Sequence, residues 1–525
     1  MAVVGASDVQ VVWFKRDLRV RDHAPLVEAA KRGPVLPLYI VEPGLWALND
    51  SAPQHWAHIR VSLEELRRST GALGAPLVVR SGEAVDVLTQ LHHELGGFES
   101  LWAHEETGNA WTYTRDRALI AWARTNRVAF NEVPRDLIVR RLASRDDWGT
   151  IAKARLARPL LAAPERVVNA TGRDGLPVTP GPLPELANLG LSTIHPPIVG
   201  GEREARRTLD SFLGGRCAGY ERKLSSPVSA WDGCSRLSAH LTFGTISLRE
   251  VMARTRRSIS ESPANRFSLR AFEERLHWRS HFVQKLEDEP SLEYASYVRP
   301  FDAIRLDPAT SALGAERFGA WTEGRTGYPM VDACMRSLNE TGWINFRMRA
   351  MLVSFASYDL WLDWRASATH LARAFIDYEP GIHYPQVQMQ SGTTGINTIR
   401  IYEPVKQGLD HDPTGDFVRR WVPELGSLDG AAVHQPWLGS DSLFGAPSTY
   451  PARIVDHAEA VATAWKTIDR LKGQARKNGT AAQVLERHGS RRPSPALRRS
   501  RVAAKPSSGS AQPPSLFADD DSAER

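Results

Sequence analysis

The chain has 525 residues, 42% of them hydrophobic and 24% charged; this composition is typical of folded globular proteins, and the length predicts more than one domain. No run of about 18 apolar residues occurs, so we expect no membrane-spanning helix and no membrane partner. The net charge of +6 allows contact with nucleic acid without requiring it. The first ten residues show no basic stretch before an apolar one, so we expect no secretory signal. Three cysteines are too few for a disulfide framework or for the four ligands of an iron–sulfur cluster. We therefore expect a cytoplasmic protein without an iron–sulfur cluster.

Residues 1–134 are predicted to form an α/β domain with a doubly wound parallel sheet. Short apolar runs alternate there with segments that carry apolar residues at helical spacing, which is the pattern of strands joined by crossover helices. The expected strands are Val9–Phe14, Val35–Val41, Ala75–Arg80 and Ser100–Ala103, and the expected helices are His55–Arg68 and Glu83–Leu95. WFKRDLR follows the first strand in place of a Gly-rich loop, so a nicotinamide-binding Rossmann site is not favoured.

The rest of the chain divides by composition into three parts. Pro and Gly accumulate in residues 135–204, which predicts a connector over the surface. Residues 205–472 contain few β-branched runs and are predicted to be an all-α domain, in which one helix begins at Pro329 and ends before Gly342. Residues 473–525 are rich in Arg, Lys, Ser and Pro without apolar periodicity, so we expect a basic disordered tail.

Gly219–Val251 contains a Ser-rich loop before a helix. Backbone N–H groups and hydroxyls in such a loop can bind an anion, so Ser235 and Ser238 are candidate phosphate ligands, with Arg236 adding charge. The alternative is an ordinary helix N-cap, a position where serine is common. From this segment alone the N-cap is the better interpretation.

Trp321–Arg365 is too apolar to leave its charged side chains unpaired; they are Arg347, Arg349, Asp359, Asp363 and Arg365. A buried charge needs a partner or a bound polar ligand. One interpretation is a set of ion pairs between helices, with Arg349–Asp359 the first of them. The other is a polar cofactor lodged among these helices.

Several segments together resemble one protein family. They are WFKRDLRVRDH, WTEGRTGYPMVDACMRSLNETGW, SFASYDLWLDWR, IRIYEP and DFVRRWVPEL, which look like blocks of the photolyases and cryptochromes, in the same order, over roughly residues 8–470. The resemblance implies light-driven chemistry with FAD, held in a folded shape by the all-α C-terminal domain. An antenna chromophore in the α/β domain is common in this family. Residues 104–116 occupy a region where antenna contacts can occur, and an acid-rich helix start is the plain alternative.

The resemblance implies cofactor-binding roles for Tyr220, Cys234, Ser235, Arg236, Leu237, Ser238, Arg275, Arg349, Asp377, Glu379 and His383. Tyr220 and the loop from Cys234 to Ser238 match the segment that binds the FAD phosphates, with Cys234 where a threonine is usual. Arg349 and Asp377 match the pair beside the flavin ring. His383 stands where the family has an asparagine facing the flavin N5, and an imidazole there can donate or accept a hydrogen bond.

The resemblance also implies a DNA-facing set, which is Trp278, Arg279, Arg347, Met389 and Lys406. The DNA-facing side departs from the family at three positions. Met389 stands where the family has a stacking aromatic residue, Arg275 stands where it has a glutamate, and Phe346 stands where it has an asparagine. Loss of a stacking ring forfeits about 1–3 kcal/mol per base, which weakens the case for ordinary dimer repair without ending it. The (6-4) photolyases carry a histidine pair where WINFRMRA has none, so that activity is disfavoured.

Catalytic roles are expected for Trp278, His383 and Trp364. Trp364 matches the middle member of the tryptophan relay that photoreduces the family's flavin, whereas Val387 and Ile304 hold the other two positions. We therefore expect an unusual electron route through Trp364. Other aromatic side chains near it in sequence are alternatives, namely Trp343, Trp361, Tyr378, Tyr384 and Tyr402.

Two functions are compatible with these residues. The first is a DNA photolyase that splits UV-induced pyrimidine dimers by electron transfer from reduced flavin to a flipped lesion, with UV-damaged DNA as its partner. The second is a cryptochrome-like blue-light photoreceptor, which the altered substrate side favours, while the basic tail favours repair. A flavoprotein with vestigial photochemistry is a third. Residues 512–517 also loosely resemble the peptides with which repair proteins bind the bacterial sliding clamp.

Overall fold

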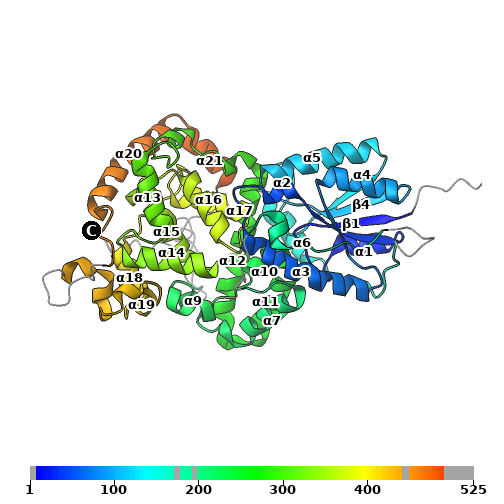
Figure 1. Cartoon of the computed structure of the whole chain (residues 1–525), viewed down its shortest axis with the longest axis horizontal. Coiled ribbons are helices and arrows are strands. Elements are labelled where there is room, and N and C mark those ends of the chain that lie inside the picture. Colours follow the sequence, from blue (N-terminus) through cyan, green and yellow to red (C-terminus); the bar gives the residue numbers. More distant parts are fainter. Residues whose placement is uncertain (1–7, 171–177, 192–197, 440–448, 490–525) are drawn as a thin grey trace, which may run out of the picture.

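Two domains lie side by side along the long axis of the molecule in the computed structural model (Figure 1). The structure describes residues 8–170, 178–191, 198–439 and 449–489. The N-terminal part of the chain forms an α/β domain, at the right of the figure, and the C-terminal part forms a helical domain at the left. This arrangement confirms the predicted fold class.

The α/β domain is built on a five-stranded parallel sheet in the order β3-β2-β1-β4-β5. Its strands are β1 Gln10–Phe14, β2 Val35–Val41, β3 Val78–Ser81, β4 Ser100–His104 and β5 Ala129–Val133. β1, β2 and β4 are buried along their whole length, as expected for apolar strands covered on both faces. β5 is a half-exposed edge strand, which the sequence prediction missed because its apolar pattern is weak.

Helices cover both faces of this sheet, which confirms the doubly wound arrangement. They are α1 Ala24–Ala30, α2 Pro43–Trp46, α3 Pro53–Ala72, α4 Ala84–Glu94 and α5 Ala110–Thr125. Side chains of β1 alternate between the faces. Val12 and Phe14 pack with α1 and α3, whereas Val11 and Trp13 pack with α4 and α5.

The predicted connector, residues 135–204, contains regular structure that the sequence did not indicate. α6, Trp148–Ala157, packs against the first helices of the helical domain through Ala152. Trp148 Nε1 also donates to the carbonyl of Leu137 at 2.9 Å. The domain boundaries at 134 and 204 themselves stay predictions.

The helical domain carries most of the secondary structure of the chain. Its helices up to residue 421 are α7 Glu202–Ser211, α8 Tyr220–Lys223, α9 Pro227–Gly233, α10 Ser238–Phe243, α11 Leu248–Glu261, α12 Arg266–Asp288, α13 Ala312–Thr322, α14 Pro329–Thr341, α15 Phe346–Ser354, α16 Trp364–Ala374, α17 Pro380–Gln390, α18 Pro404–His411 and α19 Asp416–Trp421. α14 is the helix predicted from Pro329, and Gly342 at φ 68° is its C-cap. Within the described residues, no helix has the length and apolarity needed to span a bilayer.

Two further helices follow, α20 His457–Lys477 and α21 Thr480–His488. The prediction of a disordered tail from residue 473 is therefore wrong for residues 473–488. Val484 is only 8% exposed and packs into a cluster under α20. The sequence prediction missed α21 because its apolar stripe is narrow and lies in a segment rich in charged and small residues.

The end of α21 is also fastened by polar contacts. His488 Nε2 lies 2.7 Å from Glu289 Oε2, and Arg487 donates to the carbonyl of Asp288. Residues 490–525, which include the clamp-like peptide at 512–517, lie outside the described residues.

Candidate functional site

A cavity lies among α8, α10, α12, α15 and α17 of the helical domain. Its empty volume is about 1540 Å³, including its open mouth. Mostly apolar walls with a few polar and charged groups are typical of cofactor sites. The predicted residues that line it are Tyr220, Cys234, Ser235, Ser238, Arg275, Trp278, Arg279, Arg349, Asp377, Glu379 and His383.

Other predicted residues do not line this cavity; they are Arg236, Leu237, Arg347, Trp364, Met389 and Lys406. Lys406 is exposed on α18, whereas Leu237 and Trp364 are fully buried. Trp364 Nε1 donates to Ser296 Oγ at 3.1 Å. The functional roles proposed for these residues stay predictions.

Arg349 of α15 and Asp377, just before α17, form an ion pair with two parallel contacts. The distances Nη1–Oδ1 and Nη2–Oδ2 are both 2.9 Å. The guanidinium also lies 4.1 Å from the centre of the Phe375 ring. The expected pair of Arg349 with Asp359 is wrong, because Asp359 faces α20 and contacts His457 there.

Arg279 of α12 belongs to a buried ion-pair network that joins the two domains. Its Nη2 lies 3.1 Å from Glu379 Oε2, and its Nη1 lies 3.2 Å from Asp136 Oδ2. The second oxygen of Glu379 accepts from Arg16, which follows β1, at 3.2 Å. The Arg279 side chain is 10% exposed, so a DNA phosphate would compete with these carboxylates for it.

His383 of α17 lines the cavity, and the hydrogen bond made by its Nε2 determines whether its Nδ1 donates or accepts. Nε2 lies 2.8 Å from the carbonyl of Ala368 and must donate to it. Burial lowers the pKa of His383 to about 4, so the ring is neutral near pH 7. In a neutral imidazole with a proton on Nε2, Nδ1 is an acceptor only.

The serine loop contributes Cys234, Ser235 and Ser238 to the cavity. The ordinary N-cap is not what forms here, because Leu237 holds the N-cap position of α10 without a side-chain bond. Ser235 Oγ accepts weakly from Leu237 N–H at 3.4 Å. Burial raises the pKa of the Cys234 thiol to about 12, so it is a neutral wall group.

Two buried amide oxygens in the cavity wall have no hydrogen-bond partner among the described residues. They are Asn345 Oδ1 and Gln386 Oε1. Asn345 is held by its Nδ2, which donates to the carbonyls of Leu224 and Ser225 at 3.1 and 2.8 Å. Such atoms are costly unless a ligand or water bonds to them. The sequence prediction missed both, although an asparagine directly before α15 was an available signal.

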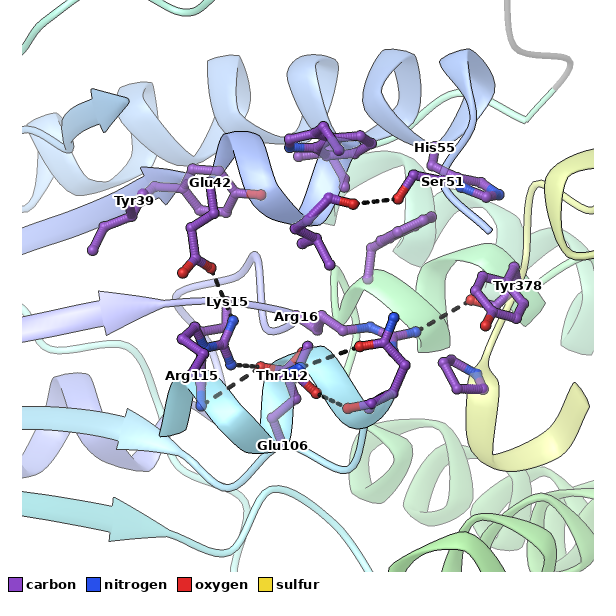
Figure 2. A pocket seen from close by; sticks show the side chains of 18 of the residues that line it. Lys15, Arg16, Tyr39, Glu42, Ser51, His55, Glu106, Thr112, Arg115 and Tyr378 are labelled. Atoms are coloured by element: carbon purple, nitrogen blue, oxygen red, sulfur yellow. Dashed lines mark hydrogen bonds and ion pairs between the residues drawn. The ribbon is translucent and has the colours of Figure 1, made fainter. Parts of the chain in front are cut away.

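A second cavity lies between the carboxyl edge of the sheet and the helical domain (Figure 2). Its empty volume is about 820 Å³. Aromatic rings of Trp13, Tyr39 and Trp46 form part of the wall, and Tyr378 closes the side toward the helical domain. Tyr378 also lines the first cavity, so the two cavities share this residue.

Buried charges lie along one side of the second cavity. Arg115 of α5 contacts Glu42 Oε2 at 2.9 Å and Glu106 Oε2 at 2.6 Å (Figure 2). Lys15 Nζ lies 3.6 Å from Glu106, and neither Lys15 Nζ nor Glu42 Oε1 has a hydrogen-bond partner in the described part of the chain. Burial raises the pKa of Glu42 to about 7. These unsatisfied groups can bond to a polar ligand.

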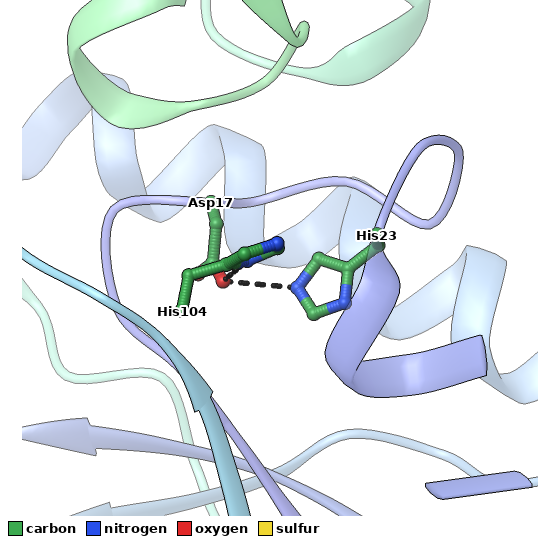
Figure 3. A group of neighbouring side chains, drawn as sticks. All are labelled: Asp17, His23 and His104. Carbon is green, nitrogen blue, oxygen red and sulfur yellow. Dashed lines mark hydrogen bonds and ion pairs between the residues drawn. The ribbon is translucent and has the colours of Figure 1, made fainter. Parts of the chain in front are cut away.

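Asp17, His23 and His104 form a compact buried cluster whose composition is that of a metal site (Figure 3). Both rings contact the same carboxylate oxygen, Asp17 Oδ2, at 2.9 and 2.6 Å. His23 Nδ1 accepts from the N–H of Leu26, so its proton is on Nε2 and is donated to Asp17. Hydrogen bonding and the N-cap of α1 account for the cluster without a metal.

Both domains match families of known proteins. Residues 10–154 match the family model of DNA photolyase, and residues 272–470 match that of the FAD binding domain of DNA photolyase. The deoxyribodipyrimidine photo-lyase of Streptomyces griseus is 32% identical over 472 residues, which cover 86% of this chain and 97% of that protein. The Escherichia coli photo-lyase is 29% identical, with 86% and 96% covered.

Solved structures agree with the sequence relatives. A bacterial class III photolyase from Agrobacterium tumefaciens has a TM-score of 0.75 at 26% identity and covers 90% of this chain and 99% of its own. An archaeal photolyase from Sulfolobus tokodaii, solved with two FAD molecules, has a TM-score of 0.71 at 25% identity, covering 88% and 99%. The chain therefore belongs to the photolyase and cryptochrome family, with the photolyase N-terminal domain and FAD-binding domain in order.

Proposed function

We propose that this protein is a light-driven deoxyribodipyrimidine photolyase that uses FAD to split UV-induced pyrimidine dimers in DNA. The observation that carries the proposal is the convergence of the predicted cofactor residues on one cavity, in a chain related along most of its length to photolyases. Bound FAD would supply the photoexcited electron that opens the dimer.

The residues of the first cavity fit FAD in chemistry. Asn345 and Gln386 offer unpaired acceptors for N–H groups of the cofactor, and the Arg349–Asp377 pair offers charge beside a flat ring. Ser235 and Ser238 supply hydroxyls for the phosphates. His383 supplies an acceptor at Nδ1 and holds no proton there near neutral pH.

The DNA side of the proposal rests on Trp278, Lys406 and Arg347. Trp278 lines the cavity and offers a ring against which a flipped base can stack. Lys406 is exposed and Arg347 half-buried, so both can contact DNA phosphates. Phe346, 37% exposed, lines the same cavity.

The second cavity supports a second chromophore in this protein. Aromatic walls suit a planar conjugated ring. Lys15 Nζ and Glu42 Oε1, which lack hydrogen-bond partners among the described residues, suit its polar edges. The relative from Sulfolobus tokodaii was solved with two FAD molecules, which implies a light-harvesting cofactor in that protein. We expect the purified protein to release a second chromophore on denaturation.

The deciding experiment exposes the purified, flavin-loaded protein to dimer-containing single- and double-stranded DNA under blue light and in darkness. Loss of dimers in the light alone is the expected result. A protein that binds flavin and responds to light but leaves dimers intact contradicts repair and supports a photoreceptor. If no flavin can be loaded, the cofactor assignment is wrong as well.

A further inference from the structure

Tyr378 lines both cavities. Figure 2 shows it at the side of the second cavity toward the helical domain. Its ring lies 5.2 Å from the ring of His383, edge to face, and 5.9 Å from the ring of His55 in a stacked arrangement. An oxidisable side chain is therefore in direct contact with the cavity that fits FAD. This position was only one of several electron-route alternatives in the sequence.

The Tyr378 hydroxyl has a buried base in hydrogen-bonding contact. It donates to Asp50 Oδ2 at 2.6 Å, and Asn109 Nδ2 donates to the same oxygen at 3.2 Å. The hydroxyl oxygen of Tyr384 lies 3.2 Å from that of Tyr378. Burial and the neighbouring Tyr384 and Asp50 hold the pKa of Tyr378 well above 10, so it rests as a phenol.

This pairing matters because a phenol that loses an electron becomes a strong acid and must lose its proton. A positioned carboxylate takes that proton in the same event and removes the barrier of charge separation. Tyr220, the other tyrosine of the cavity wall, makes no hydrogen bond to a carboxylate within the described residues. Val387 lines the cavity but has no oxidisable group, and Trp364 is not among the residues that line it.

We propose that Tyr378 is an electron donor to the light-excited flavin, with Asp50 as its proton acceptor; this inference rests on the proposed FAD site. Tyr378 gives one electron to the flavin, its Oη–H bond breaks, and the proton bonds to Asp50 Oδ2. A neutral tyrosyl radical remains. A small-molecule thiol in solution then gives Tyr378 a hydrogen atom, which restores the phenol and leaves a thiyl radical that couples with a second one to a disulfide. Asp50 releases its proton to solvent.

The test compares Tyr378→Phe and Asp50→Asn with the wild-type protein and with Tyr450→Phe. Tyr450 is a buried tyrosine of the same domain outside both cavities, and its hydroxyl donates to Asp332 Oδ2 at 2.6 Å, which makes its variant the matched control. The readouts are flavin content in the dark, the rate of flavin reduction under blue light with thiol, and the tyrosyl radical signal by electron paramagnetic resonance.

We expect Tyr378→Phe to bind flavin, to lose the tyrosyl signal and to photoreduce about 100-fold more slowly, the scale on which a positioned proton acceptor contributes. Asp50→Asn should slow the reaction similarly with flavin retained, and Tyr450→Phe should match wild type. A wild-type rate and an unchanged radical signal in Tyr378→Phe overturn the proposal. A collapse of the rate in Trp364→Phe alone also overturns it, in favour of the tryptophan route.

Failure of the repair function is distinguished by chemical reduction. Wild-type protein reduced with dithionite needs no internal donor, so its action on dimers under light tests repair alone. Dimers that persist in that assay contradict the proposed function and leave the Tyr378 radical measurement standing. If Tyr378→Phe does not fold, Asp50→Asn carries the test from the other domain.

Discussion

The guanidinium of Arg349 and the carboxylate of Asp377 meet in a parallel fork, with both N–O distances at 2.9 Å. The fork ties α15 to the segment that enters α17, the two elements between which the cavity opens. The Asp377 side chain is 4% exposed, so water has little access to replace this partner. Cavity shape and charge balance are therefore set by the same contact.

Arg349→Ala should abolish flavin retention. It leaves the buried Asp377 carboxylate unpaired, which costs on the order of 3–5 kcal/mol of folding free energy. The measurements are the flavin-to-protein absorbance ratio and urea unfolding. Arg336→Ala is the matched control, because Arg336 makes a similar half-buried pair with Glu424 away from the cavity. Equal flavin loss in both variants contradicts a specific role for Arg349.

The absorption spectrum of the bound flavin should not titrate through His383 between about pH 5.5 and pH 8. Burial lowers the pKa of His383 to about 4, so its charge stays zero across this range. His383→Gln, which cannot titrate, should give the same flat profile. A spectral transition near pH 6.5 in the wild type that disappears in His383→Gln contradicts the buried neutral ring.

Much of the α/β fold could be predicted because its strands are buried on both faces and read as apolar runs. β5 and α21 were missed because each buries only a narrow face and carries polar residues elsewhere, so neither forms an apolar run in the sequence. α14 was predicted well because Pro329 and Gly342 mark its ends through backbone conformation alone.

The cofactor site was predicted by motifs, and the contacts that connect distant segments were not. Tyr378 and Asp50 are 328 residues apart, and nothing in either local sequence indicates that they meet. The same holds for Asn345, whose amide is set by carbonyls of a loop far from it in sequence. The predicted ion pair of Arg349 with Asp359 is wrong because it was inferred from their proximity in sequence, whereas Asp359 faces α20 in the fold.

Stability should depend on pH through Glu42. Its pKa rises from 4.5 to about 7 on folding, so the protonated form favours the folded state. That contribution is complete below about pH 4.5 and is lost as the pH rises through about 7. The loss is on the order of 3 kcal/mol, taking about 1.4 kcal/mol for each pKa unit.

The unfolding free energy of wild type minus that of Glu42→Gln should therefore fall between about pH 5 and pH 8 by on the order of 2 kcal/mol. Urea unfolding at several pH values measures it. Glu340→Gln removes an exposed carboxylate on α14 and should run parallel to wild type. A difference that is constant with pH rules out the raised pKa.

Binding to DNA should depend on salt through Lys406. Lys406→Ala removes one exposed cation, so the slope of log affinity against log salt should become shallower by about one unit if the lysine contacts a phosphate. Lys31→Ala is the control, because Lys31 is exposed on the far side of the α/β domain beside Glu28. Fluorescence anisotropy with a dimer-containing oligonucleotide measures both slopes. Equal slopes for the two variants remove Lys406 from the DNA interface.

The last helix should be required for full stability, because Val484 packs inside a cluster at 8% exposure while its neighbour Leu485 is 55% exposed. Val484→Asp puts an unpaired charge into that cluster and should lower the unfolding free energy by several kcal/mol, since such a charge has no partner there. Leu485→Asp changes the same helix by the same chemistry on its exposed face, so we expect a change within about 0.5 kcal/mol. Thermal and urea unfolding of the two variants compare these faces directly. Equal effects would mean that α21 is not held against the cluster in solution, and that the boundary placed at residue 472 from the sequence is the better description.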